Sequence, residues 1–224
     1  MKSIFIIAAG LALVACAPQQ TNIIGTNISE KIFDLAPVTL DAPSMAYETI
    51  EAEMNSLNRY IGSYPPRFSD EKQRELIYQQ WLSLLAEAEA YSKLNTGSEE
   101  SLHLLSALYR QGHNLDVRSS TEHAAKNIDL CLDGYDKSIL CNFSAAYFYL
   151  SIGPDYLDKA EKSLSFLKQH YSPELNSAVE ENYVFLYLYR QDVVSARKQI
   201  DSFIKNFPAS EKVAMLVEIR ADLD

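Results

Sequence analysis

Apolar residues between positions 44 and 224 recur every three to four residues, which is the spacing that places them on one face of an α-helix. Alternation of the kind that marks a β-strand is nearly absent. Prolines and glycines interrupt the pattern at a few sharp places and divide it into segments. These segments predict nine helices and therefore an all-α fold: Ser44–Ile61, Asp70–Leu94, Glu99–Gln111, Ser120–Leu132, Ser138–Ile152, Tyr156–His170, Ala178–Gln191, Val194–Asn206 and Ser210–Asp224.

The second half of the chain contains an internal repeat. Three alanines lie 36 residues apart, and the residues four and seven positions after each of them agree in type, so that one helical face recurs. The three faces are Ala124, Ile128 and Cys131; Ala160, Leu164 and Leu167; and Ala196, Ile200 and Phe203. The helix before each face carries a large apolar residue, a small residue and a tyrosine: Leu105, Ser106 and Tyr109; Phe143, Ser144 and Tyr147; and Tyr183, Val184 and Tyr187.

This order of residues, over about 99–208, resembles the tetratricopeptide repeat. The unit Ala178–Pro208 matches best, because Ala196 follows Tyr187 after nine residues and Pro208 closes the second helix. The two earlier units have longer connections, of fifteen and thirteen residues from the tyrosine to the alanine. The resemblance implies a right-handed solenoid of helical hairpins with capping helices over 44–94 and 210–224. A more general helical-hairpin solenoid is the alternative.

The first sixteen residues have the parts of a secretory signal in order, namely Lys2, an apolar run from Ile4 to Val14, and small residues. The apolar run is shorter than the roughly 20 residues that a membrane-spanning helix needs. The tetrapeptide Leu13-Val14-Ala15-Cys16 resembles the lipobox of bacterial lipoproteins. The resemblance implies removal of residues 1–15 and a covalent lipid on Cys16.

The residues after Cys16 refine this expectation. Ala17, in place of aspartate, implies delivery to the outer membrane under the sorting pattern of enteric bacteria, where the protein would face the periplasm. Residues 16–43 are polar and interrupted by prolines, which predicts a flexible tether between the lipid and a helical domain over 44–224. An ordinary signal peptide that happens to contain a cysteine is the alternative.

Charge and cysteine content narrow the range of partners and chemistry. The formal charge of −10 argues against a nucleic-acid partner, because binding a polyanion requires a basic surface. If Cys16 carries lipid, Cys131 and Cys141 are the two remaining cysteines, and an exported compartment favours a disulfide between them over two buried thiols. We expect neither a catalytic site nor a cofactor other than the lipid, since no nucleophile elbow, phosphate-binding loop or zinc-type histidine spacing occurs.

The tetratricopeptide resemblance also implies a concave surface lined by the first helix of each pair. Its candidate binding residues are His103, Arg110, Phe148, Tyr149, Glu181, Phe185, Leu188 and Tyr189. Aromatic side chains with polar tips are enriched at protein interfaces, so we expect a peptide or a helix as the binding partner. The alternative is that these aromatic residues belong to the core. The similar tripeptides around Arg110 and Arg190 suggest a carboxylate clamp, but the two arginines are out of register by two residues, which favours solvated or ion-paired arginines.

The sequence therefore predicts a lipid-anchored adaptor that binds another protein within an assembly, secretion or maintenance complex of the cell envelope. The alternative is a solute-binding lipoprotein that serves a transport system. A closed, mostly apolar cavity of a few hundred Å³ would favour the alternative, and an open groove would favour the adaptor.

Overall fold

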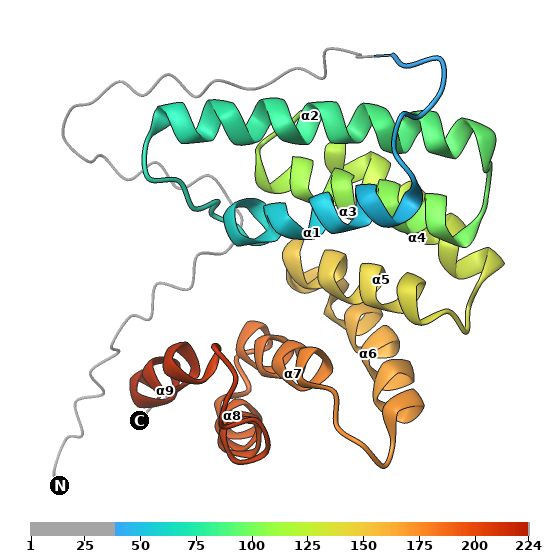
Figure 1. Cartoon of the computed structure of the whole chain (residues 1–224). Helices are drawn as coiled ribbons and strands as arrows, with labels where there is room; N and C mark the ends of the chain where they lie inside the picture. The colour runs from blue at the N-terminus through green and yellow to red at the C-terminus, as the bar shows by residue number, and fades with distance from the viewer. Residues whose placement is uncertain (1–38, 224) are drawn as a thin grey trace, which may run out of the picture.

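The computed structural model describes residues 39–223, and in that range it consists of helices and short loops without a β-strand (Figure 1). The predicted all-α class is confirmed, and each predicted helix is present with its ends within three residues of the expected positions. The signal segment and Cys16 lie outside the described residues. The helices are α1 (Tyr47–Ile61), α2 (Glu71–Leu94), α3 (Glu99–Asn114), α4 (Ser120–Gly134), α5 (Ile139–Ser151), η1 (Pro154–Tyr156), α6 (Leu157–Tyr171), α7 (Ser177–Tyr189), α8 (Val193–Asn206) and α9 (Val213–Asp222).

Short polar side chains fix where five of these helices begin. The first amides of a helix have no partner within the helix, and a side-chain oxygen at the preceding residue can accept a hydrogen bond from one of them. Asp70, Ser98, Ser138, Asn176 and Asp192 accept such bonds at the starts of α2, α3, α5, α7 and α8. These caps therefore define the first residue of α2, α3, α5, α7 and α8.

The helices pack in chain order, from α1 and α2 at the top of Figure 1 to α8 and α9 at the bottom. Each helix contacts the next one along the chain. In addition, α1 contacts α3, α3 contacts α5, and α5 contacts α7, whereas no comparably close contact joins two even-numbered helices of the described chain. The helices α1, α3, α5 and α7 thus form a continuous layer, which we call the odd row.

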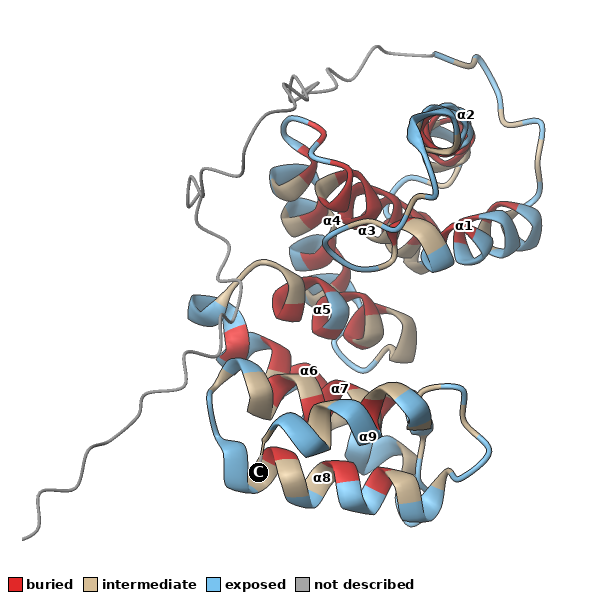
Figure 2. Cartoon of the chain, turned by 90° about the vertical axis from the view of Figure 1, so that its left-hand side faces the viewer, coloured by how far each residue is buried: buried red, intermediate tan, exposed pale blue. Residues whose placement is uncertain are grey.

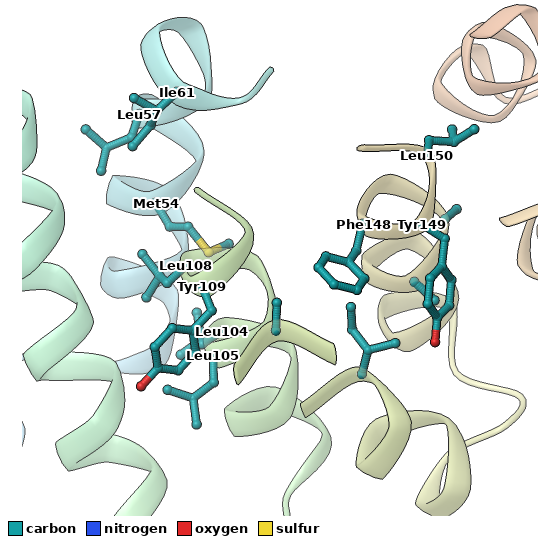
Figure 3. Packing of buried hydrophobic residues seen from close by; sticks show 14 of the residues in the cluster. Met54, Leu57, Ile61, Leu104, Leu105, Leu108, Tyr109, Phe148, Tyr149 and Leu150 are labelled. Carbon is teal, nitrogen blue, oxygen red and sulfur yellow. The ribbon is translucent and has the colours of Figure 1, made fainter. Parts of the chain in front are cut away.

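The core lies where the helices of neighbouring pairs face one another (Figure 2). Met54 and Leu57 of α1 lie opposite Leu104 and Leu108 of α3, and all four are buried (Figure 3). The indole N–H of the fully buried Trp81 donates a 2.9 Å hydrogen bond to the carbonyl of Leu108 and so satisfies its polar atom. Each fully buried side chain of this size contributes roughly 1.5–3 kcal/mol through the hydrophobic effect.

The residues of the 36-residue alanine pattern are all buried, as the repeat predicts. Ala124, Ala160 and Ala196 have no exposed surface. Because alanine projects only a methyl group, the second helix of each pair can approach the first closely at these positions. The six residues that follow the alanines on the same faces are also buried: Ile128, Cys131, Leu164, Leu167, Ile200 and Phe203.

The predicted cysteine pair joins the second helix of one hairpin to the first helix of the next. Cys131 lies near the end of α4 and Cys141 in the first turn of α5. Their sulfur atoms are 2.00 Å apart and their α-carbons 5.6 Å apart, so the two residues are at disulfide distance. Both are fully buried, and Leu102 and Leu132 pack against them.

The segment before α1 is attached to α2 through a buried carboxylate. Glu87 accepts hydrogen bonds from the amide of Ser44 at 2.7 Å, from its hydroxyl at 2.6 Å, and from the amide of Met45 at 3.2 Å. Burial acts to raise the pKa of Glu87, but these donors outweigh burial and lower it. The ammonium group of Lys93 also donates to the carbonyl of Leu40 at 3.3 Å, so the end of the predicted tether is held against α2.

Gly112 in α3 marks a close contact whose importance can be measured. A β-carbon at this position would lie 2.6 Å from both the Ser120 hydroxyl and the ring of Trp81. We expect Gly112→Ala to lower the free energy of unfolding by about 1–3 kcal/mol, as measured by urea denaturation, because the core would have to shift to admit the methyl group.

Gly134 provides the matched control, because it is also helical and a β-carbon there would contact nothing within 4 Å. Gly134→Ala should leave the stability unchanged or slightly higher. Equal losses in the two variants would show that the contact at Gly112 is not the cause.

Candidate binding surface

A small cleft lies on the odd row, where α1, α3 and α5 meet. Its volume is about 90 Å³. Three residues from each helix line it, and their spacing of one, three or four positions places each set on a single helical face. The lining residues are Met54, Asn55 and Asn58 of α1; His103, Ala107 and Arg110 of α3; and Phe143, Ser144 and Tyr147 of α5.

Arg110 is the buried charge of this cleft, with only 8% of its surface exposed. Its Nη1 donates to the carbonyl of Gly62 at 2.8 Å, and its Nη2 donates to Oδ1 of Asn58 at 3.3 Å. The ring of Tyr147 lies with its centroid 5.7 Å from the guanidinium carbon. Within residues 39–223 no carboxylate forms an ion pair with Arg110, and its hydrogen bonds there go to neutral oxygens.

His103 connects the three helices of the cleft. Its Nδ1 lies 2.9 Å from the hydroxyl oxygen of Ser144 in α5, and its Nε2 lies 3.5 Å from a carboxylate oxygen of Glu51 in α1. Burial is the largest influence on the pKa of His103 and lowers it; Glu51 and Glu99 oppose this shift, and Arg110 adds to it. The ring is thus held mainly neutral near pH 7, between a hydroxyl and a carboxylate.

Further along the odd row, the predicted residues of α7 remain partly exposed. Glu181 forms an ion pair with Lys212, with 3.3 Å between Nζ and Oε1. Phe185 and Tyr189 have ring centroids 6.3 Å apart, and Tyr189 is 47% exposed. Leu188 packs at the edge of the small core that α7, α8 and α9 share. The α7 part of the predicted surface therefore offers aromatic and polar groups to solvent.

The two predicted residues of α5 lie elsewhere. Phe148 is fully buried and Tyr149 is buried, with its hydroxyl donating to Asp129 of α4 at 3.1 Å. Both belong to the core, which was the alternative left open for the aromatic residues. The residues of α5 that do line the cleft are Phe143, Ser144 and Tyr147, which the repeat pattern had aligned with Leu105, Ser106 and Tyr109 of α3.

The predicted lining of α5 was wrong because of the register in which the repeats were aligned. The cap of α5, Ser138, follows the cap of α3, Ser98, by 40 residues, and the bonds Tyr109–Glu89 and Tyr149–Asp129 are equivalent, each spanning 20 residues. Aligning Tyr109 with Tyr147 instead uses a spacing of 38. Two residues correspond to about 200° around a helix, so the predicted lining of α5 was turned toward the core.

The predicted lining of α7 is not affected, because the spacing used from α3 to α5 was two residues too short and the spacing used from α5 to α7 was two residues too long. The cap Asn176 follows Ser138 by 38 residues, whereas aligning Tyr147 of α5 with Tyr187 of α7 uses a spacing of 40. The total spacing from α3 to α7 is 78 in both cases. The distances between cap residues were therefore the signal that could have identified Tyr147.

The second arginine of the similar tripeptides has a different environment. Arg190 lies 2.6 Å from a carboxylate oxygen of Asp158 and 2.8 Å from one of Glu161, both associated with α6. Hydrogen bonding to Glu161 is the largest influence on the pKa of Arg190 and raises it. Arg110 and Arg190 thus do not form a clamp, and only Arg110 lines the cleft.

Within residues 39–223, no group of three His, Cys, Asp or Glu side chains is arranged to hold a metal ion. In the same range no helix combines the length and the apolar character that a membrane span requires. No protein-family model matches the chain, and no curated protein or solved structure is significantly similar to it.

The buried His103 predicts a loss of stability in mild acid. In the unfolded chain this histidine has an ordinary pKa of about 6.5, and burial lowers the value in the folded chain. As the pH falls, the unfolded state therefore binds the proton before the folded state does. The contribution of neutral His103 to the free energy of unfolding is thus fully present above about pH 6.5 and is lost as the pH falls toward the pKa of the folded chain. We expect His103→Gln to lose less unfolding free energy than the wild type between pH 7.5 and 5.5.

Urea denaturation at several pH values measures this difference. The exposed His170 on α6 supplies the control, and His170→Gln should follow the wild-type pH profile. A wild-type slope in His103→Gln would contradict the assignment.

Proposed function

We propose that this protein is a lipid-anchored scaffold of the bacterial cell envelope that binds a segment of a partner protein on the odd row. The lipobox-like tetrapeptide ending at Cys16 supports the anchor, and Ala17 supports the outer membrane as its location. The buried Cys131–Cys141 pair at disulfide distance supports an oxidising compartment such as the periplasm, where disulfides persist.

We further propose that the helix pairs form a right-handed solenoid whose concave side is the odd row. The odd-numbered helices contact one another, while the even-numbered helices of the described chain lack comparable contacts. Helices that are closer together on one side of an array make it curve toward that side. In this arrangement α1 and α2 cap one end and α9 caps the other, because each has a neighbouring hairpin on one side only.

The observation that carries the proposal is the exposure of Tyr147. This tyrosine lies in the middle of the odd row, beside the cleft, and 39% of its surface is exposed. An exposed aromatic ring flanked by polar groups supplies a large contact area at a low cost in side-chain entropy, which suits recognition of a peptide or a helix. Phe185 and Tyr189 extend the same aromatic character along α7.

The solute-binding alternative is less well supported by the cavities of residues 39–223. A cavity of about 390 Å³, which is within the size range of small-molecule sites, lies beside the connection between α6 and α7, but more than half of its lining residues are exposed, so it is open rather than closed. Its buried carboxylate, Glu180, is already engaged by Lys168 at 3.4 Å and by the amide of Gln199 at 2.6 Å. The cleft on the odd row is well below the roughly 300 Å³ at which small-molecule sites begin.

The anchor is tested by Cys16→Ala. Without the thiol no lipid can be attached, so we expect the variant to move from the membrane fraction to the soluble periplasmic fraction, with the wild type remaining in membranes until detergent is added. Fractionation and immunoblotting measure the distribution. Continued membrane association of the variant would refute the lipid tether.

The binding surface is tested by photo-crosslinking in intact cells, with p-benzoylphenylalanine replacing Tyr147 or Phe185. Both positions should yield the same discrete protein adduct, because both lie on the odd row. The control position is Leu130, an exposed residue of α4 with 49% of its surface accessible, which should yield no such adduct. The same adduct from Leu130, or none from the odd row, would count against the proposed surface.

A further inference from the structure

Arg110 is a buried cation for which the described chain supplies no counter-charge. Two of its N–H groups reach neutral oxygens of Gly62 and Asn58, out of the five donors that a guanidinium carries. Removing a charge from water without an opposite charge is unfavourable, and buried arginines are normally paired. Arg190, in the matching tripeptide, has two carboxylates, so the contrast lies within one chain.

Glu51, an acidic residue beside the cleft residue His103, is already engaged. Glu51 accepts a hydrogen bond from the hydroxyl of Tyr47 at 2.9 Å and lies against His103. The Nε–H of Arg110 has no hydrogen-bond partner in the described chain and is not sealed from solvent, and Arg110 is one of the residues that line the cleft. The guanidinium is therefore fixed by two bonds while part of its donor edge stays accessible.

The size and lining of the cleft limit what can enter. Its volume of about 90 Å³ corresponds to about three water molecules, which is enough for a carboxylate with one or two methylene groups. Met54, Ala107 and Phe143 supply apolar walls for the methylenes, and the amides of Asn55 and Asn58 lie on the α1 side. These features match the end of an acidic side chain.

We infer that this cleft binds the side-chain carboxylate of an aspartate or glutamate from the partner segment, with Arg110 as its counter-charge. The inference rests on the proposed function of the odd row. The planar guanidinium can donate two parallel hydrogen bonds to a carboxylate, and Tyr147 covers one side of it. Because the whole chain carries a charge of −10, a strongly acidic partner is repelled at long range, so the acidic residue belongs to a segment that is otherwise neutral or basic.

The cleft can be tested without the partner by titrating the full chain, in detergent, with N-acetyl-glutamic acid amide. Two-dimensional NMR of the arginine Nε–H groups reports binding at Arg110 directly. We expect saturable shifts at Arg110 with a dissociation constant on the order of millimolar, the affinity expected of a single small contact. The neutral isostere N-acetyl-glutamine amide should bind at least tenfold more weakly, and this comparison needs no variant.

Substitutions then assign the effect to one side chain. Arg110→Gln should weaken binding of the acidic probe at least tenfold, and Arg110→Lys should weaken it less, because lysine keeps the charge but not the planar donor pair. Arg190→Gln is the matched control and should bind like the wild type. Absence of saturable shifts at Arg110, or equal binding by Arg110→Gln, would overturn the inference.

A third probe separates the two sources of a carboxylate. N-acetyl-glutamine carries its carboxylate on the main chain, as a protein C-terminus does, and we expect it to bind more weakly than the acidic side-chain probe. Equal or tighter binding of this probe would overturn the assignment to a side chain. The outcome is distinct from that of crosslinking at Tyr147, because the probe can fail while a partner is still captured, and the reverse also holds.

Discussion

The close approach of the two helices within each pair is the constraint on which the rest of this structure depends. The methyl groups of Ala124, Ala160 and Ala196 are fully buried at these approaches, and larger residues beside them fill the space on either side. A single hairpin buries too little surface to be stable, so each pair relies on its neighbours in the chain. Since almost all contacts join helices that follow one another or are next but one, the position of every surface residue is set by the pair that carries it.

Much of the fold could be predicted from the sequence because its determinants are local. Helical spacing of apolar residues and the breaks at proline and glycine located all nine α-helices within the described residues, although not the short helix η1. The alanine pattern identified the buried faces, and the position of Cys131 and Cys141 at adjacent helix ends predicted that they could meet. The sequence also placed His103 and Arg110 on one face of α3, and both of them line the cleft.

The features that the sequence did not predict depend on contacts between helices, which the periodicity of apolar residues does not encode. Tyr147 and Tyr149 are equally plausible as the repeated tyrosine, and the choice is made by the hydrogen bond from Tyr149 to Asp129 in the preceding hairpin. The spacing between helix caps changes from 40 to 38 residues along the chain, so a single repeat length could not align all three pairs. The ion pairs of the two arginines could not be predicted either, because the similar tripeptides around them do not indicate that Arg190 is paired with carboxylates and Arg110 is not.

The attachment of Ser44 to Glu87 determines how force would pass through the molecule. Three hydrogen bonds join this carboxylate to residues 44 and 45, which lie three and two residues before α1 begins. A pull on the chain from its N-terminal side therefore meets the long helix α2 first. The first turn of α1, and the cleft that α1 helps to line, follow these hydrogen bonds along the chain and are shielded from the load.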